Sequence, residues 1–146
     1  MSTSDLPGFL ANLDEDEIAT VLGYTEARRY TEGEVAIRRG DTDRGLYVIA
    51  TGAFAVLAPT PAGPRQVSVL RPGDIFGDLA FFDGEPRSAD VRAVESSEAF
   101  VMTPAGFERL RLAHPRLAVG FLLDLGRILS GRFRDVSGRL AALRQA

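Results

Sequence analysis

The chain has 146 residues, of which 45% are hydrophobic and 25% charged, and its formal net charge is -3 at pH 7. That length supports one well-packed core but not two ordinary domains, so we expect a single globular domain over residues 1–146. The sequence contains no cysteine, which excludes disulfides and thiolate chemistry.

No stretch approaches the roughly 20 apolar residues of a membrane-spanning helix, since the best candidate, residues 117–125, is short and contains Asp124. Residues 14–17 are all acidic, the opposite of the basic start of a signal peptide. We therefore expect a soluble, cytoplasmic protein with no membrane contact. The excess of arginine over acid in residues 105–146 is interpreted as a solvated basic face rather than as a nucleic-acid site.

A short helix is predicted over residues 14–22, because Asp14 and Glu17 resemble a capping pair and the apolar residues that follow have helical spacing. From residue 26 to residue 102, short β-branched or aromatic runs are separated by glycine turns, which is typical of a β-sandwich or a rolled barrel. The clearest runs cover residues 34–38, 46–50, 53–58, 66–70, 88–93 and 99–102.

The C-terminal segment, residues 104–146, is predicted to be helical. Thr103 and Pro104 resemble an N-cap and a first helical residue, opening a short helix that breaks near Pro115. A second helix is predicted from Arg116 to the end of the chain. At about thirty residues it spans about 45 Å, which is more than a small barrel can cover.

Apolar residues recur at three- and four-residue intervals along this longer helix. They are Leu122, Leu125, Leu129, Phe133, Val136, Leu140 and Leu143. Because the barrel cannot bury them all, we predict a homodimer formed through the C-terminal helix. Gly126, Gly131 and Gly138 weaken a helix, and close approach of another backbone explains their presence. Fraying of the last turns is the alternative.

Residues 76–89 contain the pattern most specific for a binding site. The run from Gly77 to Phe82 is too short for an independent helix, but its composition suits one tight turn bounded by Gly77 and Gly84. The start of such a turn presents unpaired backbone N–H groups, which bind anions. Arg87 heads the next strand and can point at the same place, where a phosphodiester offers two oxygens that match the guanidinium fork.

Residues 76–81 read Phe-Gly-Asp-Leu-Ala-Phe and residues 86–89 read Pro-Arg-Ser-Ala. Together they resemble the phosphate-binding cassette of the cyclic nucleotide-binding domain family. The resemblance extends upstream to residues 33–34, 40–41 and 46–49 and to Gly52, and so covers nearly the whole chain. It implies an eight-stranded jelly-roll β-barrel with a short N-terminal helix and a long C-terminal helix. The function that it implies is regulatory and not enzymatic, with the signal passing through the C-terminal helix.

The resemblance also implies roles for individual residues of this cassette. Arg87 is expected to bind the cyclic phosphate with help from Ser88 and Ala89. The backbone of Gly77 and the carboxylate of Asp78 are expected to hold the ribose 2′-hydroxyl.

Further contacts are implied for the sugar and the base. The cassette residues Leu79 and Ala80 join Val56 and Val67 in lining the ligand, with the leucine and the valines on the apolar side. The stretch of the long helix from Arg134 to Ser137 is expected to close over the base. In the family, a hydroxyl at the position of Ser88 occurs with either base and does not decide between them; of the two ligands we favour cyclic AMP over cyclic GMP.

One position departs from the family pattern. The acid that receives the 2′-hydroxyl is ordinarily Glu, whereas Asp78 is shorter by one methylene. A charged hydrogen bond contributes about 1.5–3 kcal/mol, so its loss would weaken binding about tenfold to a hundredfold.

Two alternatives follow from the same residues. Arg87 can form an ion pair with a nearby carboxylate such as Asp83, Glu85 or Asp90, which would keep a degenerate cassette folded as a ligand-free dimeric scaffold. The chain can also be the sensory fragment of a larger transcriptional regulator. Because the sequence ends at Ala146, without the helix-turn-helix of such regulators, no direct DNA binding is expected.

The sequence gives little support for an enzymatic function. A metalloenzyme of barrel shape needs two or three histidines, and the chain has only His114. A hydrolase needs a nucleophile with a base, and no Gly-x-Ser-x-Gly motif is present. We therefore expect no metal and no catalytic residue.

Overall fold

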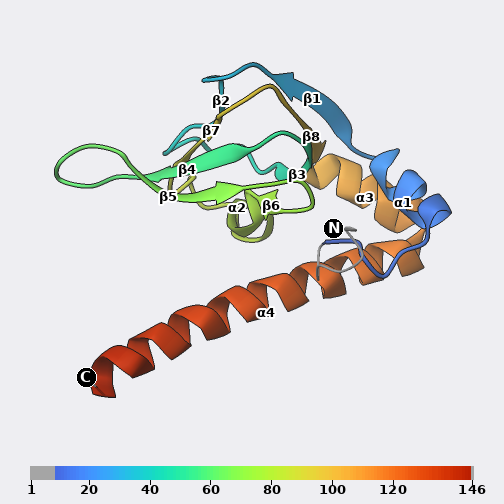
Figure 1. Cartoon of the computed structure of the whole chain (residues 1–146). Coiled ribbons are helices and arrows are strands. Elements are labelled where there is room, and N and C mark those ends of the chain that lie inside the picture. The colour runs from blue at the N-terminus through green and yellow to red at the C-terminus, as the bar shows by residue number, and fades with distance from the viewer. Residues whose placement is uncertain (1–8, 146) are drawn as a thin grey trace.

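The computed structural model describes residues 9–145. That part of the chain forms four helices and eight strands (Figure 1). In chain order they are α1 (Glu15–Leu22), β1 (Glu26–Tyr30), β2 (Val35–Ile37), β3 (Leu46–Thr51), β4 (Phe54–Ala58), β5 (Arg65–Leu70), β6 (Ile75–Phe76), α2 (Asp78–Asp83), β7 (Asp90–Ala93), β8 (Ser97–Met102), α3 (Pro104–Ala113) and α4 (Pro115–Gln145).

The eight strands form two four-stranded antiparallel sheets, with the orders β1-β8-β3-β6 and β2-β7-β4-β5. The predicted eight-stranded jelly roll is confirmed, although the sheets face each other as two layers and do not close into one barrel. Strands β1 and β6 are additional to the runs identified in the sequence. The first is a charged strand paired with β8, and the second has only two residues.

Helix starts follow the local signals in the sequence. At α1, the Asp14 carboxylate accepts from the Glu17 N–H at 2.8 Å, and the Glu17 carboxylate accepts from the Asp14 N–H at 3.1 Å. At α3, the Thr103 hydroxyl accepts from the Gly106 N–H at 3.0 Å, with proline in the first turn. Both predicted N-caps are confirmed.

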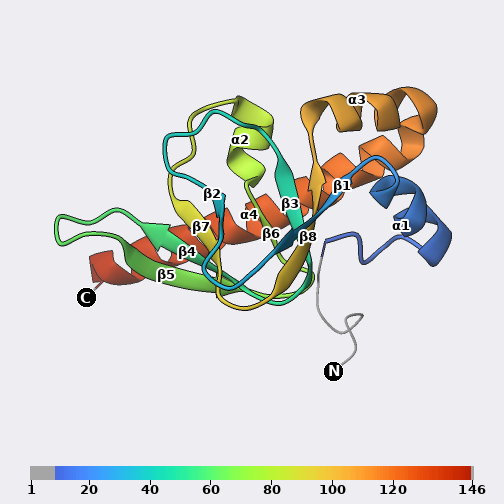
Figure 2. The same cartoon turned by 90° about the horizontal axis from the view of Figure 1, so that it is seen from above.

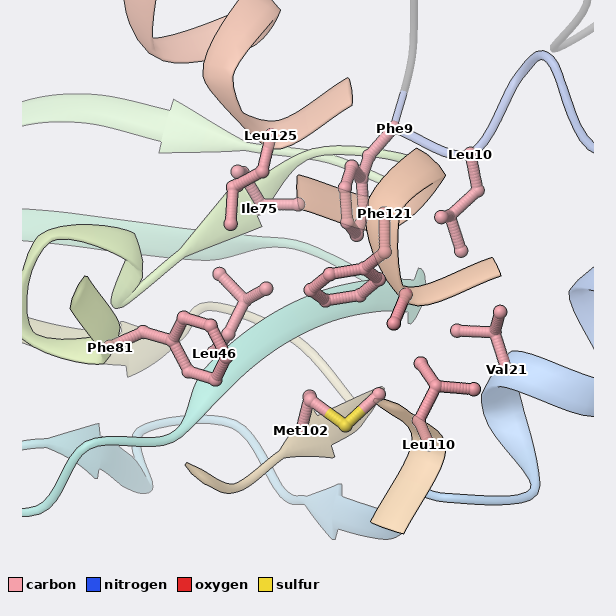
Figure 3. Packing of buried hydrophobic residues seen from close by; sticks show 11 residues of the cluster. Phe9, Leu10, Val21, Leu46, Ile75, Phe81, Met102, Leu110, Phe121 and Leu125 are labelled. Atoms are coloured by element: carbon pink, nitrogen blue, oxygen red, sulfur yellow. The ribbon is translucent and has the colours of Figure 1, made fainter. Parts of the chain in front are cut away.

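Apolar side chains gather in two clusters. The first lies inside the roll, where the Tyr47 and Phe76 rings stack at 4.6 Å and Phe54 packs on Phe76 at 5.0 Å. The second joins the roll to the helices at one end (Figures 2 and 3). There the Phe121 ring of α4 lies 6.3 Å from Phe81 of α2. The short helix α2 is therefore anchored to the first half of α4 through the core.

The long helix α4 packs on the roll only along its first half. Phe121 and Leu125 are buried, whereas Phe133, Val136 and Leu140 are 72%, 53% and 57% exposed. Figure 1 shows α4 diverging from the sheets toward its C-terminal end. Leu143, the last member of the predicted apolar series, lies outside the residues whose side chains are described. Over the described range, none of the helices combines the length and apolar character that a membrane span requires.

Candidate functional site

A pocket of about 540 Å³ lies between the roll and α2. Its volume is within the range of small-molecule sites, about 300–1,000 Å³. One wall is apolar and comes from the strands: Ile37, Val56, Leu70, Ile75, Phe76 and Val91. The opposite wall is the segment that connects β6 to β7, including α2, and Ser68 and Arg132 complete the lining. The pocket thus presents an apolar face opposite a polar one.

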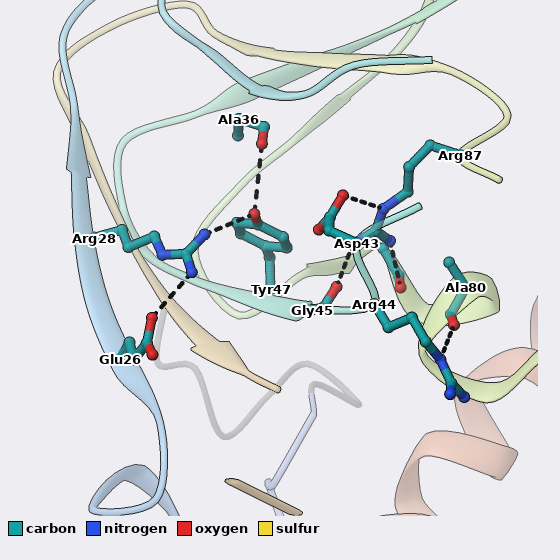
Figure 4. A network of polar contacts seen from close by, with 10 residues as sticks. Glu26, Arg28, Ala36, Asp43, Arg44, Gly45, Tyr47, Ala80 and Arg87 are labelled. Atoms are coloured by element: carbon teal, nitrogen blue, oxygen red, sulfur yellow. Dashed lines mark hydrogen bonds and ion pairs between the residues drawn. The ribbon is translucent and has the colours of Figure 1, made fainter. Parts of the chain in front are cut away.

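Arg87 is the buried cation of the polar wall, with 5% of its surface exposed. Its Nε and Nη2 donate to the two carboxylate oxygens of Asp43 at 3.2 and 2.7 Å (Figure 4). Nη2 also donates to the Gly45 carbonyl at 2.8 Å, and Nη1 donates to the Gly77 carbonyl at 2.9 Å. Four of the five guanidinium N–H groups therefore point to acceptors of the protein itself.

Asp43 neutralises this buried cation from a position near the surface, with 48% of its side chain exposed. Hydrogen bonding to Arg87 lowers the pKa of Asp43, and the accompanying desolvation only partly opposes that shift. The ion pair that we considered for Arg87 exists, but with a different acid from the three suggested by proximity in sequence. Of those three, Asp90 instead accepts from the backbone N–H of Arg39 at 2.6 Å.

Gly77 is the N-cap residue directly before α2 and has a left-handed conformation, with φ at 78°. A Cβ at this position would lie 2.7 Å from the Gly45 carbonyl oxygen and 2.8 Å from Nη1 of Arg87. Both the backbone angle and the space therefore require glycine. The close approach brings the start of α2 against the guanidinium of Arg87.

Asp78, the first residue of α2, is 6% exposed and is bound by α4. Its Oδ2 accepts from Nη1 of Arg132 at 3.1 Å, and Nη2 of Arg132 donates to the Ile75 carbonyl at 3.1 Å. Arg132 thus links the long helix to the polar wall of the pocket. The sequence analysis missed this residue.

The packing of α4 explains why Arg132 faces the pocket. On α4, Leu125 is fully buried and Ile128 is partly buried against the core. Arg132 continues this three- and four-residue spacing by one more turn, so an arginine occupies the face of α4 that packs on the roll. An inward-facing arginine requires an anionic or carbonyl partner, which the polar wall supplies.

The structure brings most of the predicted site residues together at the pocket. The predicted residues among the lining are Gly77, Asp78, Leu79, Ala80, Arg87, Ser88, Ala89 and Val56. Val67 is 58% exposed on β5 and does not line this pocket, and neither do Arg134 and Ser137, which are exposed on α4. Their contacts with a ligand stay predictions. The residue of α4 that lines the pocket is Arg132, two residues before the stretch that was expected to do so.

The features of this pocket indicate which kind of ligand it can hold. A two-sheet roll encloses a pocket with an apolar wall, a buried arginine and a carboxylate, which suits a small ligand that combines an anionic group, hydroxyl groups and an apolar ring. Among the described residues, no three histidine, aspartate or glutamate side chains are placed to share a metal ion.

The protein-family model of the cyclic nucleotide-binding domain matches residues 27–114, which is more than half of the chain. The chain therefore belongs to the cyclic nucleotide-binding domain family, as its sequence indicated.

Individual relatives agree with this assignment. The Cyclic AMP receptor protein of Thermus thermophilus is 28% identical over 132 residues, 90% of this chain and 59% of that protein. A cAMP-dependent protein kinase regulatory subunit of Blastocladiella emersonii is 33% identical over 104 residues, 70% of this chain and 26% of the subunit. The crystal structure of the Thermus thermophilus Catabolite Activator Protein matches with a TM-score of 0.82 and 27% identity, over 95% of this chain and 63% of that one. The chain spans less than two thirds of the length of each.

The ion pair between Asp43 and Arg87 generates a first prediction. Replacing Asp43 with Asn should lower the free energy of unfolding at pH 7 by about 1–2 kcal/mol, because Arg87 stays buried without a full countercharge. This is less than for a fully buried pair, since solvent screens a half-exposed acid. Urea denaturation without ligand measures the difference, with Asp41→Asn as the control at an exposed neighbour.

The contribution of this ion pair to the free energy of unfolding should depend on pH. The folded-state pKa of Asp43 is depressed, so its contribution is present above the unfolded-state value of about 3.9 and is lost as the pH falls toward the folded value. The difference between the parent protein and Asp43→Asn should therefore shrink below about pH 4. Equal stability of the two proteins at pH 7 would contradict the assigned role.

Proposed function

We propose that this chain is a regulatory, non-catalytic module that binds a cyclic mononucleotide, with cyclic AMP favoured over cyclic GMP. The observation that carries the proposal is Arg87, a buried arginine in the wall of a half-apolar pocket, held in place by Asp43. The single histidine, His114, caps the C-terminal end of α3 and is not part of the pocket lining. The names of two relatives, a Cyclic AMP receptor protein and a cAMP-dependent kinase subunit, support the choice of ligand.

The cyclic phosphate is proposed to bind at Arg87. Its negative charge can share the guanidinium with Asp43, or replace that half-exposed carboxylate as it turns toward solvent. Ser88 and Ala89 line the same wall and follow the arginine directly. The base then lies against the apolar wall, where Val56 and Val91 remove it from water.

The proposed contact of the ribose connects the pocket to α4. Its 2′-hydroxyl is proposed to donate to Asp78, the carboxylate that Arg132 of α4 already contacts. A ligand that engages this carboxylate must share it with Arg132 or displace the arginine. Either result changes the contact that holds the middle of α4 to the roll, so occupancy of the pocket can alter the position of the helix.

The homodimer is proposed to form along the exposed edge of α4. Val119, Leu122, Gly126, Leu129, Phe133, Val136 and Leu140 follow the alternating spacing of three and four residues that a two-stranded coiled coil uses. A Cβ at Gly126 would meet nothing within 4 Å inside this chain, so the close approach that we inferred for this residue involves no described part of the same molecule. A second copy of α4 supplies it in the proposed dimer.

Ligand binding is tested directly by calorimetry. Cyclic AMP or cyclic GMP should bind with micromolar affinity, and Arg87→Ala should remove most of that binding because the phosphate loses its paired cation. Arg92→Ala, an exposed arginine on β7, is the matched control and should bind like the parent protein. If neither nucleotide binds the parent protein at millimolar concentration, the ligand-free scaffold is the better account.

The dimer is tested by light scattering. Phe133→Asp should give a folded monomer, because it places a charge in the middle of the apolar edge. Ala141→Asp introduces the same charge on an exposed face of the same helix, outside the three- and four-residue series, and should leave the dimer intact. A parent protein that is monomeric at high concentration would count decisively against the proposal.

Asp78 provides the test of ribose recognition. Its carboxylate is one methylene shorter than the acid usual in the family, so Asp78→Glu should tighten binding of the ribonucleotide by about 1–2 kcal/mol, or about fivefold to thirtyfold. A 2′-deoxy cyclic nucleotide, which lacks the hydroxyl, should show almost no change. Titrating both proteins with both ligands gives a double-mutant cycle that isolates this one bond. Equal or weaker ribonucleotide binding by Asp78→Glu would mean that the pocket is adapted to aspartate.

A further inference from the structure

Arg44 holds the C-terminal end of α2. Its Nε donates to the Ala80 carbonyl at 3.1 Å, and its Nη2 donates to the carbonyls of Phe81 and Phe82 at 2.9 and 3.3 Å. The guanidinium also lies against Gly84, where a Cβ would be 3.4 Å from Nε. Figure 4 shows Arg44 reaching α2 from the segment that also contacts Arg87.

The helix α2 depends on such outside partners. It has six residues, which is too short for a helix to be stable by itself. The last carbonyls of a helix lack partners within it, and here the Gly84 N–H satisfies only that of Ala80, at 2.9 Å. Arg44 supplies donors for the next two carbonyls and places a positive charge at the negative end of the helix.

The residues on either side of Arg44 hold the other half of the polar wall. Asp43 binds Arg87 through its carboxylate, and Gly45 binds it through its carbonyl. This segment is itself fixed, because it leads into the buried strand β3 and a Cβ on Gly45 would lie 2.7 Å from Val101. Three consecutive residues therefore set both the position of Arg87 and the position of α2.

We propose that Arg44 is a positioning residue of the nucleotide pocket, which fixes Asp78 relative to Arg87 by holding the far end of α2. The inference rests on the proposed nucleotide binding. Arg44 acts without touching the ligand: it keeps α2 ordered before binding, so that less conformational freedom is lost when the ribose hydroxyl reaches Asp78. Its effect is therefore greatest for a ligand that uses Asp78.

The first measurement needs no ligand. Hydrogen exchange of Arg44→Gln should be faster than in the parent protein at the amides of Phe81 and Gly84, which close the helical turns of α2, and unchanged in β8. Arg65→Gln, at an exposed position on β5, is the matched control. Unchanged exchange at both α2 amides would overturn the inference, whatever the protein binds.

The second measurement compares cyclic AMP with its 2′-deoxy analogue by calorimetry. Arg44→Gln should weaken ribonucleotide binding by about fivefold to twentyfold and deoxynucleotide binding by no more than about threefold. Arg44→Lys keeps the positive charge but lacks the planar guanidinium, so its loss of ribonucleotide binding should be intermediate. It serves as the test variant if Arg44→Gln does not fold. Equal losses for the two ligands, or no loss, would overturn the positioning role. If the parent protein binds neither ligand, the proposed function fails, while hydrogen exchange still decides whether Arg44 orders α2.

Discussion

A guanidinium buried as deeply as that of Arg87 must keep its charge balanced, and much of the site is arranged around that requirement. Asp43 supplies the countercharge, and the carbonyls of Gly45 and Gly77 accept two of the remaining donors. The carbonyl of Gly77 can approach only because that residue lacks a side chain and begins α2 in a left-handed conformation. The pairing of one cation thus brings together the loop before β3 and the start of the short helix.

The buried charged side chains of the polar wall are paired with groups of the protein itself. Asp43 stands where it balances the charge of Arg87, and Arg132 does the same for Asp78. In the proposed function, an anion would therefore enter an existing set of ion pairs and exchange partners, instead of ordering loose side chains. Such preorganisation lowers the entropic cost of binding. The same exchange would couple binding to α4, because Arg132, the partner of Asp78, belongs to that helix.

Local patterns in the sequence predicted the parts of this structure that local interactions determine. The capping pair at Asp14, the helix start at Thr103 and the turn bounded by Gly77 and Gly84 each depend on a few neighbouring residues. The partner of Arg87 was not predictable in this way, because Asp43 lies 44 residues away and meets it only where the loop before β3 lies beside the segment before β7. Arg132 was missed for a related reason. The rotation of α4 about its axis is set by the packing of Leu125 on the roll, and that contact decides which arginine faces the pocket.

The length of α4 beyond its last contact with the pocket gives it the properties of a lever. About 13 residues follow Arg132 within the helix, and at 1.5 Å per residue they extend about 20 Å. A rotation of about 5° at the level of Arg132 would move the far end by about 2 Å, a shift of the size seen for helices at subunit interfaces. With the pivot instead at Leu125, which is fully buried, Arg132 lies about 10 Å and the end of α4 about 30 Å from the pivot, so a shift where α4 meets Asp78 is enlarged about threefold at the far end.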